Sequence, residues 1–457
     1  MRHYLIEASY FLASILFILG LRGLSHPETA RRGMHLAEFG MLMAIIGTLM
    51  HQDIVSYEWI IAGLLLGSAI GTGIGLWVPM TAMPQRTAFS HAFGALAAAL
   101  VGISEYSLHG SELSRFTMGA IGFDVLLGSL TTTGSLVAFA KLQGMLPGRP
   151  LTYKGQNIFN LSLLGVILLA FVILIFHPGM APLFYLMAFL SLIFGVLLVL
   201  PIGSADMPVV IALLNAYAGL ASAAIGFAIS NNVLIIAGTL DGGSGFILSI
   251  VMCRAMNRSI TAVLFGAFGK VSESAASETG GTMRVVNIED LAPQLAYARQ
   301  VVFVPGYGMA TAQAQHAVRE LSTALEKAGV TVKFAIHPVA GRMPGHMNVL
   351  LAEANIPYSQ LYELEQINPD FAATDVAVVV GANDVVNPDA RDNSSSPIAG
   401  MPILEVDRAK AVVVLKRGSG KGFSGLENPL FTKPNCAMLY GDAKESLTQL
   451  TQAVIKV

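Results

Sequence analysis

The chain has 457 residues, of which 54% are hydrophobic and only 12% are charged. Its mean hydropathy is +0.63. A soluble domain usually carries about 25% charged residues, so a wholly soluble protein is excluded. The net charge of -2 gives no basis for binding nucleic acid. Cys253 and Cys436 stand far apart in the sequence, so we predict neither a disulfide framework nor a metal site.

The charged residues are unevenly distributed along the chain. Residues 1–258 hold 11 of the 27 Lys and Arg and 10 of the 29 Asp and Glu, although they make up more than half of the length. Residues 253–298 break the apolar pattern, and the stretch "KVSESAASETGGTMRVV" within them is small, polar and Gly-rich, which is typical of a linker. The sequence therefore predicts a multi-span α-helical membrane domain over 1–252, a linker over 253–298 and a soluble domain over 299–457.

The first domain contains nine segments long enough to span a membrane. A helix needs about 20 mostly apolar residues to cross a hydrocarbon core of ~30 Å. The first segment is expected to be a retained helix, because no signal-peptide cleavage site follows it. The third contains Gly63, Gly67 and Gly71, a spacing typical of close helix packing. The segments are 4–21, 34–50, 58–78, 86–105, 116–140, 158–176, 182–200, 207–229 and 232–252.

Nine crossings would place the two ends of the chain on opposite sides of the membrane. Lys and Arg gather in cytoplasmic loops, and the loops on one side carry only Arg2 and Arg115. We therefore predict an N-terminus outside and a cytoplasmic C-terminal domain. The other side carries Arg22, Arg31, Arg32, Arg86, Lys141, Arg149, Lys154, Arg254 and Arg258.

Ionisable groups inside these segments are candidate functional residues, because burying them in a bilayer is costly. His91, in the fourth segment, can take and release a proton near neutral pH. A proton relay through His91 and a buried structural histidine are both consistent with the sequence. Asp206 opens the eighth segment, where it would equally serve as a helix cap, and Asn215 follows nine residues later.

The remaining polar groups lie in the second and fifth segments. Glu38 is in the second and Asp124 in the fifth. The fifth is also rich in hydroxyl groups between 129 and 135, including Ser135. Hydroxyl groups at such positions usually bond back to their own helix, so a role in proton transfer is the less common alternative.

The second domain alternates buried strands with helices from residue 300 onward. This alternation predicts an α/β doubly wound parallel sheet of the Rossmann-like type. A Gly-rich turn separates the first strand from an amphipathic helix that Gly329 closes. The predicted strands are "VVFVP", "VTVKFAIHP", "DVAVVVGAND" and "AVVVLKRG", and "GDAKESLTQLTQAVIKV" is a closing helix.

The first turn reads Gly306-Tyr307-Gly308-Met309-Ala310-Thr311-Ala312. It nearly fits the G-x-G-x-x-G/A fingerprint of dinucleotide sites, although Thr311 occupies the last position. Gly306 would permit the sharp turn, and Gly308 would let backbone N–H groups approach a pyrophosphate. A Gly-rich turn without a ligand is the alternative.

Two features favour NADP(H) over NAD(H). An NAD site usually has a carboxylate at the end of the second strand, but this strand ends at Ile336-His337-Pro338. The strand "AVVVL" instead leads to Lys416, Arg417 and Ser419. Two cations and a hydroxyl group are suited to a 2′-phosphate. A solvated basic loop is the alternative.

Several long motifs resemble the beta subunit of proton-translocating NAD(P) transhydrogenases. The resemblance covers nearly the whole chain, including the number of predicted spans. It rests on "PGYGMATAQAQ", "HPVAGRMPGHMNVLLAEA", "GANDVVNPDA", "SPIAGMPILEV" and "YGDAK" in the soluble domain, and on "ADMPVVIALLNAYAG" and "MCRAMNRS" in the membrane domain.

The resemblance implies a set of site residues. His91, Asn215 and Ser135 would lie on the proton pathway, with Asp206 near the membrane-domain surface. One position departs from the family, in which a tyrosine usually stands where this chain has Phe423. The NADP(H) contacts implied are Gly306, Tyr307, Gly308, Met309, Ala310, Arg342, Gly345, Gly381, Asn383, Asp384, Lys416, Arg417, Ser419, Gly441, Asp442, Ala443 and Lys444.

The resemblance also implies an activity and partners. Hydride would pass between NADH on an alpha subunit and NADP+ on this chain while protons cross the membrane. The assembly would be a dimer of alpha–beta units in a bacterial inner membrane. The alternative function is a secondary transporter regulated by an NADP(H)-sensing domain.

Overall fold

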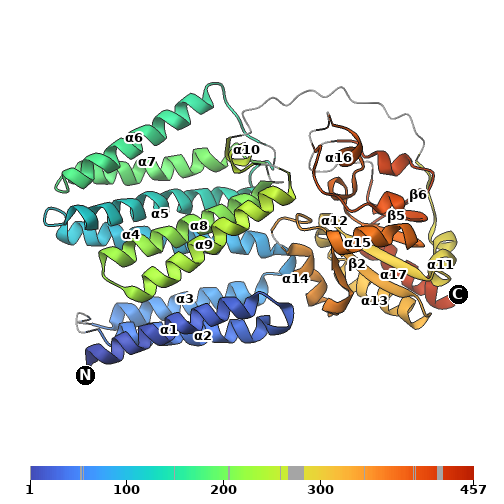
Figure 1. Ribbon diagram of the computed structural model, residues 1–457, viewed down its shortest axis with the longest axis horizontal. Helices are drawn as coiled ribbons and strands as arrows, with labels where there is room; N and C mark the ends of the chain where they lie inside the picture. The colour runs from blue at the N-terminus through green and yellow to red at the C-terminus, as the bar shows by residue number, and fades with distance from the viewer. Residues whose placement is uncertain are drawn as a thin grey trace. The chain divides into compact units, whose positions relative to one another are not determined.

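The computed structural model describes residues 2–51, 54, 56–148, 150–203, 206–257, 259–265, 283–343, 345–394, 396, 398–418 and 426–457. The chain divides into two compact units, one built from long helices and one that contains a β-sheet. We call the helices α1–α9 the helical unit and residues 283–457 the sheet domain (Figure 1). Each is described by itself.

A helix forms at each of the nine segments predicted to span the membrane. Within the described residues, eight of these helices are long and apolar enough to cross a bilayer, and α2 is not among them. Its sequence includes Glu28, Arg31, Arg32 and Glu38. The nine-span count therefore stays a prediction, as does the opposite placement of the chain ends. The helices are α1 (Arg2–Leu24), α2 (Pro27–Leu49), α3 (Glu58–Trp77), α4 (Met83–His109), α5 (Arg115–Leu142), α6 (Gln156–Phe176), α7 (Ala181–Val199), α8 (Met207–Ala228) and α9 (Asn232–Ala255), and the short α10 (Ile260–Phe265) follows.

Glycines allow several of these helices to pack closely. A Cβ atom on Gly128 of α5 would lie 3.0 Å from the carbonyl oxygen of Ala95 in α4. A Cβ atom on Gly242 of α9 would lie 3.1 Å from the backbone nitrogen of Leu220 in α8. The glycines of α3 differ, because the space around Gly63, Gly67 and Gly71 is open in the described structure and α3 buries no residue. Helix packing through α3 is therefore not found within the described residues.

The sheet domain contains a six-stranded parallel sheet in the order β3-β2-β1-β4-β5-β6. This is the strand order of the dinucleotide-binding doubly wound fold, and the predicted fold class is confirmed. Val301 on β1 lies beside Val332 of β2 and Val376 of β4. The strands are β1 (Gln300–Pro305), β2 (Thr331–Ile336), β3 (Leu361–Glu363), β4 (Val376–Val380), β5 (Ala411–Lys416) and β6 (Cys436–Tyr440).

Both faces of the sheet are covered by apolar packing. Val413 and Leu415 of β5 join one core, and Val412 and Val414 join the other, as strand alternation requires. The first core also receives buried residues from α11 (Ile288–Ala296), α13 (Gln315–Lys327), α14 (His346–Glu353) and α17 (Ala443–Lys456). The second is closed by α15 (Leu364–Ile367), η5 (Asn368–Ala373), η7 (Val406–Arg408) and η8 (Pro429–Thr432).

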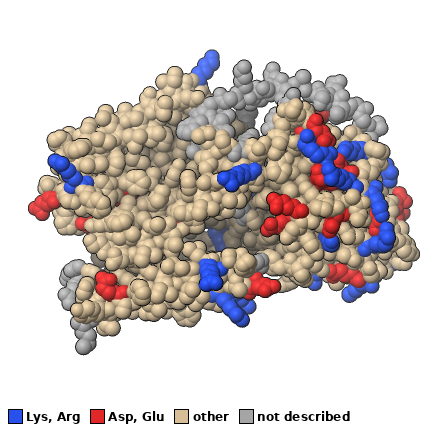
Figure 2. Space-filling view, viewed as in Figure 1, with Lys and Arg blue, Asp and Glu red and all other residues tan. Residues whose placement is uncertain are grey.

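Charged side chains follow this division. Figure 2 shows few of them over the visible face of the helical unit and many over the sheet domain.

The structure also contains elements that were not predicted from the sequence. Strands β3 and β6 were not predicted, and α11 lies within the predicted linker. The helix after the first turn is interrupted, because α12 (Tyr307–Thr311) ends before Gln313, whose φ is 49°.

Candidate functional site

The carboxyl ends of β1 and β4 form the centre of the candidate nucleotide site. Strand order reverses between these two neighbouring strands, and ligands of doubly wound sheets bind at such a switch point. Gly306 and Gly308 follow β1, and Gly381 follows β4. The predicted fingerprint turn therefore lies at the crevice that the fold provides.

The glycines of these two loops pack backbone against backbone. The Gly306 N–H donates to Val380 O at 2.9 Å, and the Gly308 N–H donates to Gly381 O at 2.8 Å. A Cβ atom on Gly308 would lie 2.6 Å from the Cα atom of Gly381. The Gly308 N–H is therefore used within the protein instead of facing a ligand, and the glycine is required for loop packing. Met309 and Ala310 are buried, so their side chains belong to the core.

Tyr307 and Arg342, which the resemblance implies as NADP(H) contacts, pack against each other. The Arg342 guanidinium carbon lies 4.2 Å above the centre of the Tyr307 ring. Gly345, with a φ of 67°, precedes α14, whose first residue His346 accepts a hydrogen bond on Nδ1 from the Arg342 N–H at 3.1 Å. Burial lowers the pKa of His346 to about 4 and also lowers the pKa of Arg342. Arg342 remains a cation that an anionic ligand can approach.

The loop after β4 carries Asn383 and Asp384. The Asn428 amide nitrogen donates to both the backbone and side-chain oxygens of Asn383, each at 3.0 Å. Asn387 is fully buried and donates to Glu427 O at 3.1 Å. These contacts bind the loop after β4 to the segment that begins at residue 426.

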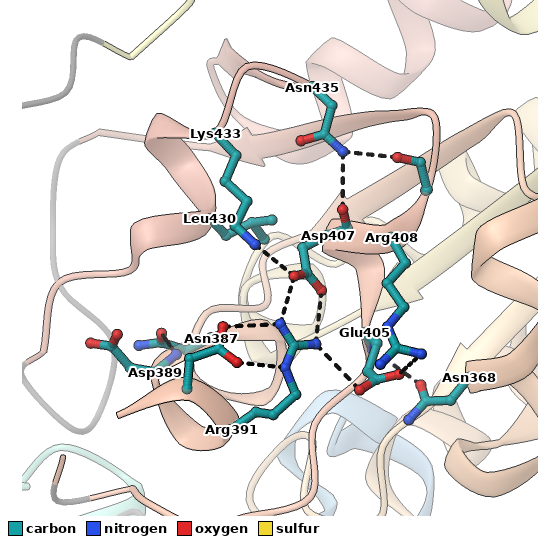
Figure 3. A network of polar contacts seen from close by, with 12 residues as sticks. Asn368, Asn387, Asp389, Arg391, Glu405, Asp407, Arg408, Leu430, Lys433 and Asn435 are labelled. Carbon is teal, nitrogen blue, oxygen red and sulfur yellow. Dashed lines mark hydrogen bonds and ion pairs between the residues drawn. The ribbon is translucent and has the colours of Figure 1, made fainter. Parts of the chain in front are cut away.

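A network of ion pairs holds the far end of the same loop (Figure 3). Arg391, in α16 (Asp389–Asp392), contacts Asp392 at 2.7 Å, Asp407 at 2.9 Å and Glu405 at 3.2 Å. Lys433 contacts the same Asp407 carboxylate at 2.6 Å. Burial alone would raise the pKa of Asp407, but hydrogen bonds from Arg391 and Lys433 outweigh it and hold this pKa below its usual value. The network therefore fixes the loop after β4 against the segments that flank β5.

Lys416 and Arg417 stand at the carboxyl end of β5. Lys416 is partly buried, with its Nζ atom 4.5 Å above the Phe431 ring, and burial lowers its pKa. Arg417 is exposed. Ser419 and Phe423 lie outside the described residues. Two cations therefore meet at one strand end, with one anchored by an aromatic ring and one open to a ligand.

The Gly441-Asp442-Ala443 stretch begins α17. The Gly441 N–H donates to Lys416 O at 3.1 Å, which ties the ends of β5 and β6 together. Asp442 caps the helix, since its Oδ1 accepts from the Lys444 N–H at 2.9 Å and the Glu445 N–H at 3.3 Å. Ala443 is buried. These residues shape the rim beside Lys416.

The end of β2 carries a buried histidine where an NAD site would carry a carboxylate. His337 Nε2 lies 2.7 Å from Pro402 O, and its Nδ1 accepts from the Val339 N–H at 3.2 Å. Only 1% of the residue is exposed, and burial lowers its pKa to about 4. His337 is therefore a neutral structural residue at neutral pH.

A second set of candidate functional residues lies in the helical unit. The Asn215 amide nitrogen in α8 donates to Asp241 Oδ1 in α9 at 3.0 Å. The same Asp241 carboxylate acts electrostatically on His91 in α4, whose Nδ1 is buried without a hydrogen-bond partner among the described residues. Asp241 thus links His91 to Asn215. Sequence reasoning missed it, although an aspartate near the middle of an apolar span was a sufficient signal.

The other predicted residues of this region are less closely connected. Ser135 in α5 is 1% exposed, and its hydroxyl group has no partner in the described part of the chain. Asp206 immediately precedes α8. Within the described residues, no group of three or more His, Cys, Asp and Glu could hold a metal ion.

Comparisons with known proteins agree with this geometry. Residues 6–453 match the family model described as NAD(P) transhydrogenase beta subunit. Two curated proteins of Rhodospirillum rubrum, both called NAD(P) transhydrogenase subunit beta, are each 46% identical to the chain over 471 residues. The alignments cover 99% of this chain and 100% of each relative.

Proposed function

The chain belongs to the NAD(P) transhydrogenase beta subunit family, and on that premise we propose that it binds NADP(H) on its sheet domain. Hydride is exchanged with NAD(H) held by an alpha subunit, and this exchange is coupled to proton movement through the helical unit. The described residues contain one parallel sheet with one switch point. The second nucleotide therefore needs a partner chain, which the word "beta" in the relatives' names also implies.

The pair of cations after β5 is the observation that carries the choice of NADP(H). Lys416 and Arg417 supply positive charge at a strand end, and the end of β2 supplies only the neutral His337. A ribose 2′-phosphate is stabilised by cations and destabilised by a carboxylate. The proposal therefore puts the adenosine half of the nucleotide on the β5 side of the switch point.

The residues around the crevice fit the rest of a dinucleotide. The paired glycine loops leave no side chain between β1 and β4, so the nucleotide backbone can pass close to the protein. Arg342, stacked on Tyr307, offers a cation to the pyrophosphate. When bound, the nicotinamide supplies the hydride chemistry, and the protein contributes position and exclusion of water.

Proton coupling is assigned to His91, Asn215 and Asp241. The imidazole of His91 can accept and release a proton near neutral pH, and Asp241 accepts a hydrogen bond from Asn215. A proton crossing about 150 mV releases roughly 3.5 kcal/mol. At about 1.4 kcal/mol per tenfold, this would shift the NADP+/NADPH ratio roughly several-hundred-fold. Coupling also requires that protonation change nucleotide affinity, and the reverse.

The proposal also covers the membrane, the orientation of the chain and its assembly. We place the chain in a bacterial inner membrane, with the N-terminus outside and the sheet domain in the cytoplasm, because Lys and Arg gather in the loops of one side. The functional assembly is a dimer of alpha–beta units in the lipid bilayer.

The cation pair gives the test of this function. Lys416→Ala combined with Arg417→Ala should weaken NADPH binding by at least about tenfold and leave the weak binding of NADH nearly unchanged, because NADH has no 2′-phosphate. Lys410→Ala is the matched control, since Lys410 precedes β5 at its opposite end and pairs with Asp375. Isothermal titration with both nucleotides measures the difference, and equal weakening of the two would contradict the assignment.

A second measurement separates the proposal from a transporter that only senses NADP(H). With the alpha subunit present, the enzyme reduces an NADP+ analogue with NADH. A transporter would show nucleotide-dependent flux without redox turnover.

A further inference from the structure

One carboxyl group in the helical unit belongs to neither site described above. Asp124, in α5, is 0% exposed. Neither of its side-chain oxygens has a hydrogen-bond partner among the described residues. It faces Gly102 of α4, where an added Cβ atom would collide with Asp124 Oδ2 and lie 2.8 Å from Val125 Cγ2. The glycine therefore leaves the space that the carboxyl group occupies.

Asp124 lies in line with two other unpartnered groups on the same helix. Thr131 and Ser135 follow it by seven and eleven residues, which places all three on one face of α5. Both hydroxyl oxygens are buried and have no hydrogen-bond partner in the described structure. We call Asp124, Thr131 and Ser135 the α5 polar stripe. It extends over about 16 Å, roughly half of a hydrocarbon core.

The polar stripe leads to His91. Helices α4 and α5 are in contact where Gly102 meets Asp124 and where Gly128 meets Ala95 and Ala99. Since the chain runs in opposite directions in the two helices, His91, four residues before Ala95, lies at the level of Ser135. Its buried Nδ1 also has no partner among the described residues. Unsatisfied polar atoms thus continue from Asp124 to His91 along one helix interface.

The neighbouring hydroxyl groups show that this arrangement is specific. Thr132 donates to Gly128 O at 2.7 Å, and Thr133 donates to Leu192 O at 2.7 Å. These two satisfy the expectation that hydroxyl groups bond back to helix carbonyls. Thr131 and Ser135, on the face of α5 that is turned toward α4, depart from it among the described residues. Buried polar groups without protein partners are normally hydrogen-bonded to water, so the stripe is a place for water between helices.

An ionised carboxylate without a partner is too costly at this depth, so Asp124 rests in its neutral, protonated form. We propose that Asp124 is a second proton-holding residue, connected to His91 through water along Thr131 and Ser135. Asp124 gives its proton to this water chain, and the imidazole of His91 takes one up. The resulting carboxylate then regains a proton from the Arg115 end of α5. This inference rests on the proposed coupling of hydride transfer to proton movement.

The test compares proton uptake with hydride transfer in lipid vesicles that contain this chain and its alpha subunit. NADPH and an NAD+ analogue are supplied, and a trapped pH dye reports protons. Asp124→Asn keeps the shape of the side chain but cannot release a proton. We expect it to slow proton uptake and the coupled hydride transfer by at least about tenfold, as loss of a proton-transfer group does. After detergent extraction, the variant and the unaltered chain should elute alike in size-exclusion chromatography with the alpha subunit, which separates a relay from a folding defect.

Thr131 and Thr132 provide a matched pair on the same helix. Thr131→Val removes a hydroxyl group from the stripe and should slow proton uptake severalfold, whereas Thr132→Val removes one that is bonded to Gly128 O and should leave it unchanged. If Asp124→Asn fails to assemble, seen as aggregation after detergent extraction, this pair decides alone. Wild-type rates in Asp124→Asn, or equal effects of the two valine variants, would overturn the inference and leave the proposed function intact. Absence of proton uptake with the unaltered chain would overturn both.

Discussion

His337 illustrates how a buried histidine makes the sheet domain sensitive to acid, and His346, whose pKa is also lowered to about 4, acts in the same direction. The pKa of His337 falls to about 4 because burial disfavours the imidazolium form, while the unfolded chain titrates near the ordinary value of 6.5. The folded-state pKa is the lower one, so this stabilisation is fully present above about pH 6.5 and is lost as the pH falls toward 4. The shift corresponds to about 3 kcal/mol in the free energy of unfolding.

We therefore predict that His337→Gln flattens the pH dependence of stability between pH 7 and pH 4.5. Hydrogen exchange of the β1 and β4 amides in the full chain reports the free energy of opening at each pH. His316, an exposed residue of α13, gives the control variant His316→Gln. If the two variants lose stability in parallel as the pH falls, His337 is not the group responsible.

At the residue scale, the sequence indicated candidate site residues, but it did not indicate which other residues they contact. Tyr307 and Arg342 were expected to share a ligand, and they are in contact. That Gly308 lets backbone N–H groups approach a pyrophosphate stays a prediction, but a motif could not reveal that its own N–H donates to Gly381 O in the loop after β4. Asp241 was missed although its place in an apolar span was a sufficient signal, but its hydrogen bond with Asn215, 26 residues away in the sequence, could not be predicted.

At the scale of elements, the close contact between the loops after β1 and β4 decides whether a nucleotide can enter. Gly381 has a φ of 65°, and an added Cβ atom there would collide with the Cα atom of Gly308. Gly329 also has a positive φ, of 84°, but the space around its Cβ position is open. The two glycines therefore share backbone strain and differ in crowding.

This difference gives a second prediction. Gly329→Ala should lower the free energy of unfolding by about 1 kcal/mol, the usual cost of a left-handed alanine. Gly381→Ala should lower it by several kcal/mol more and abolish NADPH binding, because the loop of Gly308 must move. Thermal unfolding and NADPH titration of both variants measure this. Similar losses in the two variants would show that crowding at Gly381 is unimportant.

Long elements were predictable from the sequence, and short ones were not. Strands β1, β4 and β5 are largely apolar runs, which is the pattern of strands buried on both faces, and β2 was predicted although it contains Thr331 and Lys333. Strand β3 has only three residues, too few for a periodic signal. Helix α3 satisfied every sequence criterion for packing, yet its glycines contact no other helix in the described residues. A spacing of small residues predicts that a helix can be approached, but it does not say by which element.

At the scale of the whole molecule, the parallel sheet follows from alternating strands and helices, but its strand order and the beginning of the sheet domain do not. Residues before 299 read as linker because many of them are small and polar. In the structure, the Val286 N–H donates to Met438 O at 3.0 Å, and the Met438 N–H donates to Arg284 O at 2.7 Å. Residues 284–286 thus extend the sheet beside β6.

Helix α11, which follows these residues, is also part of the sheet domain. The side chain of Asn287 caps the helix by accepting from the Asp290 N–H at 2.8 Å. Leu291 and Leu295 are both 0% exposed and belong to the core that contains α13 and α17. Burying a leucine contributes about 1.5–3 kcal/mol, so α11 supplies several kcal/mol to the sheet domain.

The last prediction concerns the smallest part of the chain that folds and binds NADP(H). A fragment of residues 283–457 should be soluble and bind NADPH without the membrane, because it contains the whole sheet, both cores and the cation pair. A fragment of residues 299–457 should unfold at a markedly lower denaturant concentration. Without α11 and residues 284–286, apolar surface on α17 and the edge of β6 are exposed, which also favours aggregation. Urea unfolding and NADPH titration of the two fragments measure the difference. Equal stability would mean that α11 belongs functionally to the linker, and a soluble, folded 283–457 fragment unable to bind NADPH would contradict the assigned nucleotide site.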